Sequence, residues 1–306
     1  MSASSKKVIL AALVGNTLVA LTKFAAAAVT GSSAMLAEGV HSLVDTGNQI
    51  LLLIGLRKAQ KKADAKFPFG YGKEVYFWSF VVAILIFAVG SGVSIYEGIH
   101  QLVFPSPIKN PLVNYVVLLL ALLFEGAALY FALTEFTRAK GKWGYFEAVC
   151  KGKDPTLFVV LFEDSAAMLG LLVAFFGVLL THLTGNLFFD GAASILIGFI
   201  LGGTAIWLAY ETKGLLIGES ADPRAVNAIR SLLEATPEIE HVNEVLTLHM
   251  GPEYILVNLS VDFADRLSAL DIETCIKRLD LEIKSNNPIV KRVFIEAESR
   301  TKQIQR

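Results

Sequence analysis

The stretch Ala34-Met-Leu-Ala-Glu-Gly-Val-His-Ser-Leu-Val-Asp45 places ionisable side chains inside an otherwise apolar segment. His41 and Asp45 are four residues apart, and because a helix turns about every 3.6 residues, they lie on one face, one turn apart. Ionisable groups in a membrane-spanning helix are costly and usually face a partner, a cavity or a transported ion. A histidine and a carboxylate on one face also form half of a tetrahedral zinc site.

The composition around this stretch is typical of a membrane protein. Of the 306 residues, 54% are hydrophobic. They come in blocks of about twenty, the length that crosses a bilayer core. We therefore expect six transmembrane helices, at residues 8–30, 34–56, 75–101, 112–136, 155–182 and 187–211.

Lys and Arg gather in alternate connections between these blocks. The connection after the second block holds Arg57, Lys58, Lys61, Lys62, Lys66 and Lys73. The connection after the fourth holds Arg138, Lys140, Lys142, Lys151 and Lys153. By the positive-inside rule, both termini lie on the cytoplasmic side. The start has no cleavage site after a short apolar core, so we expect an uncleaved first helix in a bacterial inner membrane.

Several classes of function are disfavoured by composition and motifs. A net charge of −1 gives no reason to expect nucleic acid as a partner. Cys150 and Cys275 lie far apart and outside any Cys-x-x-Cys pattern, so we interpret them as reduced thiols. The sequence has no His-Glu-x-x-His and no Gly-x-Ser-x-Gly, which a metal-dependent or serine-dependent membrane enzyme would offer.

Residues 216–306 have the charged character of a soluble domain. Asp222-Pro-Arg begins a helix that runs to about Ala235. Residues 243–250 and 254–263 alternate as a strand pair, 268–284 have helical periodicity, and 291–298 alternate again. The order αββαβ predicts a compact α+β domain of ferredoxin-like type. We therefore expect a six-helix transmembrane domain, 1–215, and a cytosolic domain, 216–306.

Four motifs, taken in order, support a resemblance to a known family. They are Gly31-Ser-Ser-Ala34, the segment Glu38–Asp45, Phe67-Pro-Phe-Gly-Tyr-Gly-Lys-Glu74 and Asp190-Gly-Ala-Ala-Ser194. Together with the tail, they make nearly the whole chain resemble the cation diffusion facilitators, a family of metal–proton antiporters. The segments Phe124–Ala128, Asp154–Ala167 and Thr184–Asn186 further resemble the branch that includes the mitochondrial zinc transporter of animals.

The resemblance implies a homodimer in the bilayer, with a metal site between the second and fifth helices. The family's fifth helix supplies His or Asp and a second Asp four residues on. Here these positions hold Val160, which cannot bind metal, and Asp164. Glu163 lies on the helix next to the direction in which Val160 points, and its long side chain can turn into the position that Val160 leaves without a ligand. We therefore expect the site to be His41, Asp45, Asp164 and Glu163, although Glu163 could instead carry protons or pair with Lys23.

Other polar residues are expected to support this site. Glu125 could be a ligand, a proton relay or a hydrogen-bonding partner; we favour a relay or supporting role, grouped with Lys23 and Asn16. Glu38 is expected to be structural. The resemblance also implies a charge contact between Lys73 and Glu219, for which a lysine at the headgroup level is the alternative.

Two further metal sites of the family look absent. In the Pro-Phe-Gly loop, the flanking His positions are Phe67 and Tyr71, which leaves Asp64. The tail lacks a His cluster. Near the corresponding positions it has Asn258, Asp271, Glu296 and Glu298. These are weak candidates, because carboxylates on a solvated face usually bind no metal.

The function expected from the sequence is export of a divalent transition metal from the cytoplasm by alternating access. Zn²⁺ is the first candidate for the cargo, with Mn²⁺, Fe²⁺ or Co²⁺ as alternatives. Protons are the counter-ion, and no catalytic cofactor is expected. The alternatives from other classes are a metal-dependent membrane enzyme and a non-transporting scaffold that dimerises through its tail.

Overall fold

A computed structural model describes residues 3–140, 144 and 155–300, with the backbone alone for residues 3–15, 139, 156 and 157. The chain divides into two compact units, Met1–Arg57 with Val75–Lys213 and Lys58–Glu74 with Gly214–Arg306. The connection 58–74 therefore belongs to the tail unit, whereas the sequence predicted it to be part of the transmembrane domain 1–215. Cys150 lies outside the described residues, as do Lys142, Lys151 and Lys153.

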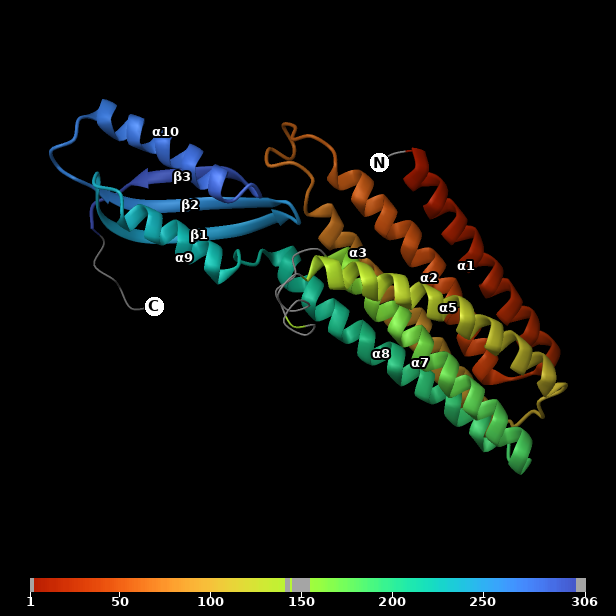
Figure 1. The fold of residues 1–306 in the computed structure, drawn as a ribbon. Helices are drawn as coiled ribbons and strands as arrows, with labels where there is room; N and C mark the ends of the chain where they lie inside the picture. The colour runs from red at the N-terminus through yellow and green to blue at the C-terminus, as the bar shows by residue number, and fades with distance from the viewer. Residues whose placement is uncertain (1–2, 141–143, 145–154, 301–306) are drawn as a thin grey trace. The chain divides into compact units, whose positions relative to one another are not determined.

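All six apolar blocks are helical, and Figure 1 shows these helices running along one another in the first unit. They are α1 (Ala3–Thr30), α2 (Ser33–Ala59), the continuous α3 (Glu74–Leu85), η1 (Ile86–Ser91) and α4 (Gly92–Val103), then α5 (Pro111–Ala139), α7 (Pro155–Thr184) and α8 (Phe188–Ile217). Within the described residues, four spans are long and apolar enough to cross a membrane: Glu74–Val103, Pro111–Arg138, Phe158–Thr184 and Phe188–Ile217.

The two remaining helices differ from these four for separate reasons. The described side chains of α1 begin at Asn16, and the stretch Asn16–Thr30 is apolar but shorter. In α2, polar residues repeat through the middle of the helix and lower its hydropathy; they are Glu38, His41, Asp45, Asn48 and Gln49. Of the six long helices, α2 is thus the least apolar, and it carries the predicted ligands His41 and Asp45.

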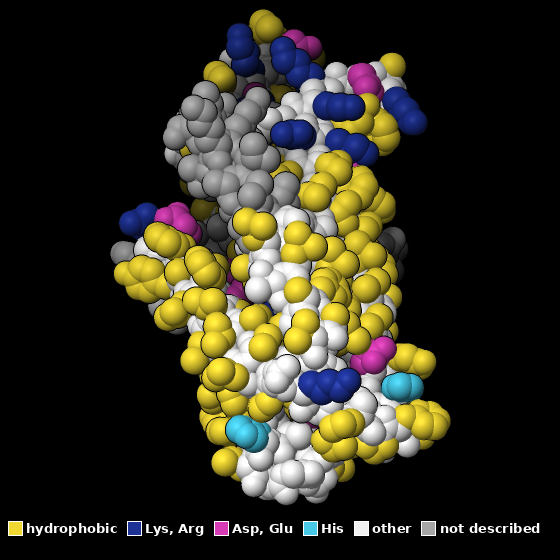
Figure 2. All heavy atoms as spheres, turned by 90° about the vertical axis from the view of Figure 1, so that its right-hand side faces the viewer, with side chains coloured by type: hydrophobic (Ala, Val, Ile, Leu, Met, Phe, Trp, Pro, Cys, Tyr) yellow, Lys and Arg dark blue, Asp and Glu magenta, His cyan; other side chains and the backbone are white. Residues whose placement is uncertain are grey.

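The outward faces of the helical unit are apolar, as contact with lipid requires. On α5, Leu123, Phe124 and Phe131 are 73%, 65% and 67% exposed. Figure 2 shows one such face, where hydrophobic side chains form a broad band and charged side chains are sparse. The fold is therefore that of a helical membrane protein.

Small residues bring α4 and α8 into close contact. A Cβ on Gly98 would lie 2.7 Å from Gly191 O, and one on Gly198 would lie 2.5 Å from Ile95 Cγ1. Ser194 Oγ on α8 donates to Ser94 O at 2.9 Å. Glycine and serine at such positions let helix backbones approach and hydrogen-bond within a membrane.

The tail unit holds the elements in the predicted order. They are α9 (Pro223–Glu234), β1 (Ile239–Gly251), β2 (Tyr254–Phe263), α10 (Ala269–Asn286) and β3 (Val290–Ala297). The sheet order is β1-β2-β3, with β1 antiparallel and β3 parallel to β2. Asp222 caps α9 by accepting from Arg224 N at 2.8 Å, as its Asp-Pro start predicts.

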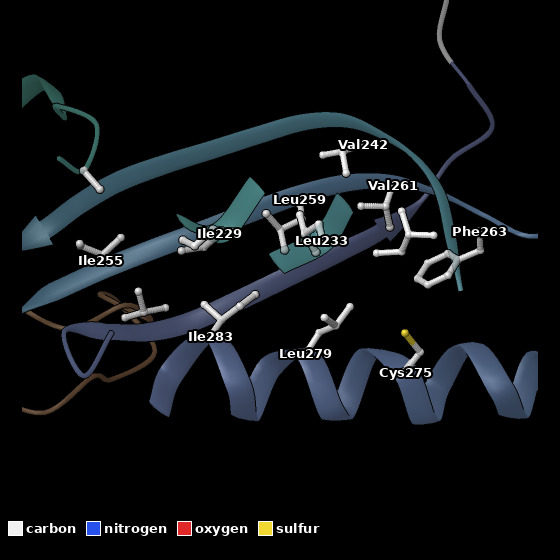
Figure 3. Packing of buried hydrophobic residues seen from close by; sticks show 14 residues of the cluster. Ile229, Leu233, Val242, Ile255, Leu259, Val261, Phe263, Cys275, Leu279 and Ile283 are labelled. Carbon is white, nitrogen blue, oxygen red and sulfur yellow. The ribbon is translucent and has the colours of Figure 1, made fainter. Parts of the chain in front are cut away.

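Alternation in the strands separates a covered sheet face from an open one. Val257, Leu259 and Val261 of β2 are fully buried against the helices. Figure 3 shows Leu279, Ile283 and the free thiol Cys275 pointing from α10 toward the strands. On the opposite face, the paired positions Leu246, Asn258 and Phe294 form one row across the sheet, and Leu246 and Phe294 are 52% and 42% exposed.

The connection 58–74 packs on the β1–β2 turn of the same unit. A Cβ on Gly72 would collide with the Met250 carbonyl oxygen, so this backbone approach requires glycine. The ring of Phe69 lies edge-on to Phe294, with centroids 6.5 Å apart. The contact joins the segment that follows α2 to the tail sheet.

Candidate metal site

The predicted ligands of α2 are buried side by side. His41 is 1% exposed, and its Nδ1 lies 3.5 Å from Asp45 Oδ1. Neither ring nitrogen of His41 has a hydrogen-bond partner, and neither does Asp45 Oδ1. Buried polar atoms in native proteins are nearly always satisfied, so these atoms are available to a cation or a proton.

Across from α2, helix α7 supplies the two carboxylates predicted from its sequence. Glu163 is 5% exposed and accepts a hydrogen bond from Asn48 Nδ2 at 2.8 Å, while Asp164 is half-buried. In this arrangement Glu163 pairs with Asn48, whereas Lys23 forms ion pairs with Glu38 and Glu125. Asn48 therefore orients Glu163 from the opposite helix.

A cavity of about 20 Å³ lies between these helices, with room for a single water-sized occupant. It is lined by Asn16, Ser42, Asp45, Gln49, Glu125, Val160, Glu163 and Asp164. Three of the four predicted ligands thus meet at one cavity, and His41 adjoins it through Asp45. Val160 forms part of the wall, between the two carboxylates of α7.

Within the described residues, no three His, Cys, Asp or Glu side chains already have the spacing of a metal site. Coordination by all four predicted ligands therefore requires side-chain rotation about the cavity. His41 and Asp45 have no other hydrogen bonds to break on these atoms, whereas Glu163 would have to share its carboxylate with Asn48.

A second polar cluster adjoins the cavity and centres on Lys23 of α1. Its ammonium forms ion pairs with Glu38 Oε2 at 3.1 Å and Glu125 Oε1 at 3.5 Å, and donates to Ser42 Oγ at 2.7 Å. Lys23 and Glu38 are fully buried. Sequence reasoning described Glu38 as structural and missed this ion pair. The sequence did contain a signal that Glu38 is buried, since Glu38, His41 and Asp45 lie on one helical face at spacings of three and four residues.

The Gly-Ser-Ser-Ala and Asp190-Gly motifs meet at the N-terminal end of α2. The buried Asp190 carboxylate accepts from Ser32 Oγ at 2.6 Å, Ser33 N at 2.7 Å and Ser33 Oγ at 3.0 Å. A carboxylate that accepts from the first backbone N–H groups of a helix acts as its cap. Asp190 therefore anchors the start of α2, and with it His41, to α8.

Two of the weaker candidates, Asp64 and Asp271, form hydrogen bonds within the tail unit. Asp64 accepts from Tyr71 Oη at 2.6 Å and from Phe67 N at 2.8 Å, and these hydrogen bonds lower the pKa of its carboxyl. Asp271 forms the capping box of α10 with Ser268. These bonds already account for both carboxylates.

The other two candidate carboxylates of the tail, Glu296 and Glu298, both lie next to Ser260 of β2. Glu298 accepts from Ser260 Oγ at 2.7 Å, and Glu296 is exposed. Lys73 Nζ donates to Leu216 O at 3.4 Å, and the Glu219 carboxylate lies against Gly214. The charge contact between Lys73 and Glu219 stays a prediction.

Comparison with known proteins agrees with this arrangement. Residues 9–217 match the family model of the cation efflux transmembrane domain. The chain is 37% identical over 264 residues to the "Proton-coupled zinc antiporter SLC30A9, mitochondrial" of Xenopus laevis, which covers 85% of this chain and 47% of the relative. It is 32% identical over 261 residues to "Metal tolerance protein C4" of Arabidopsis thaliana (85% and 57%), and 24% over 269 residues to "Manganese efflux system protein MneP" of Bacillus subtilis (84% of each).

These relatives correct one expectation and identify the family. The chain spans about half the length of the frog relative. Because that relative is named as a mitochondrial protein, the assignment to a bacterial inner membrane is wrong. The physical reason is that Lys and Arg asymmetry orients helices within a membrane and carries no information on which membrane it is. The family match over most of the helical unit agrees with the motifs of α2 and α8. The chain therefore belongs to the cation efflux family, the cation diffusion facilitators.

Proposed function

We propose that this protein exchanges a divalent transition metal, zinc first, for protons across a membrane, and that His41, Asp45, Glu163 and Asp164 bind the metal. The observation that carries the proposal is the cavity between α2 and α7, where Asp45, Glu163 and Asp164 meet next to a buried His41 without hydrogen-bond partners. The printed name of the frog relative supports zinc and proton antiport. The metal is cargo, and the proposal includes no catalytic step and no cofactor.

The exchange follows from the chemistry of the ligands. Metal binding requires a neutral imidazole and ionised carboxylates, so a proton and a metal compete for the same lone pairs. Several carboxylates that face one another without water are costly unless protons or a cation offset their repulsion. Alternating access then exposes this site to protons on one side and to metal on the other.

The architecture belongs to the same proposal. We propose that all six long helices span the membrane, α2 included, because its polar residues turn toward α7 and α1 rather than outward. The tail would be a ferredoxin-like domain that joins two copies of the chain. The open sheet face with Leu246 and Phe294 supports self-association, since exposed apolar surface of this kind often marks an interface.

Flux measurements in reconstituted vesicles test the proposed metal site. Asp45→Asn and Asp164→Asn, which keep side-chain volume, should each lower zinc uptake under an imposed pH gradient by at least about 100-fold, because a four-ligand site loses one anionic ligand. Val160→Ala, in the wall of the same cavity, is the matched control and should retain uptake. Near wild-type flux in either Asp variant would remove that residue from the site.

Manganese is a second candidate for the cargo. Three of the four proposed ligands are carboxylates, which suit Mn²⁺ as well as Zn²⁺, and a relative at 24% identity is named as a manganese efflux protein. Competition of the two ions for uptake in the same vesicles separates them. Zinc uptake that is unaffected by an excess of manganese would exclude manganese as cargo.

A further inference from the structure

Lys23 lies inside the helical unit with its side chain fully buried. Its partners come from two other helices: Glu38 and Ser42 from α2, and Glu125 from α5. A charge in the membrane interior is costly unless it is paired and hydrogen-bonded. Three polar partners around one ammonium indicate that the placement of this charge has a function.

Glu125 lies between Lys23 and the metal cavity. Its side chain lines the cavity together with Asp45 and Asp164. It also lines a larger groove of about 460 Å³ between α1 and α5, together with Lys23. Glu125 is therefore a fourth carboxylate at the wall of the proposed metal site, and its Oε1 is 3.5 Å from a cation.

The state of Glu125 decides how many anionic ligands a metal meets. With Glu125 paired to Lys23, the metal is offered His41 and three carboxylates, a four-ligand set of the kind that zinc prefers. With Glu125 released from Lys23, its carboxylate is free to turn to a metal in the cavity, which then meets a fourth carboxylate. A larger and more oxygen-rich ligand set favours manganese.

We propose that Lys23 determines metal specificity: its ammonium holds Glu125 out of the coordination shell and keeps the site selective for zinc over manganese. Lys23 does not bind the metal and is a positioning residue. The inference rests on the proposed function, because it takes the metal site on α2 and α7 as given.

A set of variants measures this role in vesicles that contain the full chain. Lys23→Met alone would leave Glu38 buried without its partner, so the test variant is Lys23→Met combined with Glu38→Gln, which releases Glu125. We expect the ratio of Mn²⁺ to Zn²⁺ initial uptake to rise by roughly tenfold, the lower end of the effect of altered ligand partners. Adding Glu125→Gln to this variant should return the ratio toward the wild-type value.

Glu38→Gln alone is the matched control, since it leaves Lys23 next to Glu125; the ratio should stay at the wild-type value. Equal losses of both uptakes in the test variant, with an unchanged ratio, would make Lys23 merely structural and overturn the inference. A raised ratio that persists after Glu125→Gln would overturn it as well. Wild-type protein that carries neither metal would instead contradict the proposed function, so the two failures are distinguishable.

Discussion

At the scale of single residues, the helical unit separates two kinds of polar contact. Lys23 and Glu38 form a buried ion pair through Glu38 Oε2, as buried charges usually do. His41 and Asp45 leave polar atoms without hydrogen-bond partners. Such atoms cost stability in an apolar environment, and their concentration next to one cavity is the residue-level sign of a binding site.

Asn48 provides a test of the ligand role of Glu163. Because Asn48 Nδ2 donates to the Glu163 carboxylate at 2.8 Å, it sets the orientation of that side chain. Asn48→Ala should weaken apparent zinc affinity about 10- to 100-fold, as loss of a ligand's hydrogen-bonding partner typically does. Zinc-dependent uptake rates measure this affinity. If Asn48→Ala alters only the dependence of uptake on pH and leaves zinc affinity unchanged, Glu163 is a proton carrier and not a ligand.

At the scale of elements, glycine positions determine how closely the helices approach. Gly170 of α7 is one of them: a Cβ there would collide with Glu38 Oε1 of α2. The absence of a side chain at Gly170 thus makes space for the carboxylate that pairs with Lys23. The ion pair between α1 and α2 therefore depends on a residue of a third helix.

Gly170→Ala should destabilise the helical unit by about 1–3 kcal/mol, the usual cost of overpacking. Gly203→Ala on α8 is the matched control, because its Cβ would meet nothing within 4 Å. There the substitution should be neutral or stabilise by about 0.5–1 kcal/mol, since alanine favours helix. Thermal unfolding of the full chain in detergent measures both. Equal unfolding temperatures for the two variants would show that the Glu38 carboxylate can move aside freely.

At the scale of the whole molecule, each unit has its own kind of interior. The helical unit holds its polar groups in the middle and turns apolar side chains outward. The tail unit has an apolar core between its helices and one sheet face, and Leu246 and Phe294 are partly exposed on the other face. The connection 58–74, which follows the helix of His41, packs within the tail unit at Gly72 and Phe69.

The proposed self-association places a second copy of the chain against the sheet face of Leu246 and Phe294. Leu246→Lys places a charge on this face, and it should convert a dimer to monomers as measured by light scattering of the full chain in detergent. Leu281→Lys, at a site on α10 that is 61% exposed, is the matched control and should leave the dimer intact. A dimer that survives Leu246→Lys but not Leu281→Lys would place the interface on the helical side of the tail.

The sequence by itself determined the elements and the family. Blocks of about twenty apolar residues predicted the six helices, because that length alone spans a bilayer core. The spacing of His41 and Asp45 predicted their shared face, and the alternation in the tail predicted the strands, because both are local periodicities. Motifs of α2 and the tail order together led to the cation diffusion facilitators, as the family match confirmed.

Only the tertiary structure decided which polar groups are partners. The pairs Lys23 with Glu38 and Glu125, and Glu163 with Asn48, join different helices. Asp190 likewise reaches Ser32 and Ser33 across 157 or more residues of sequence. Each pairing depends on how helices rotate and cross, which is set by close contacts such as those at Gly170 and Gly98 rather than by any local pattern. A helical period places a side chain on a face, but packing decides what that face meets.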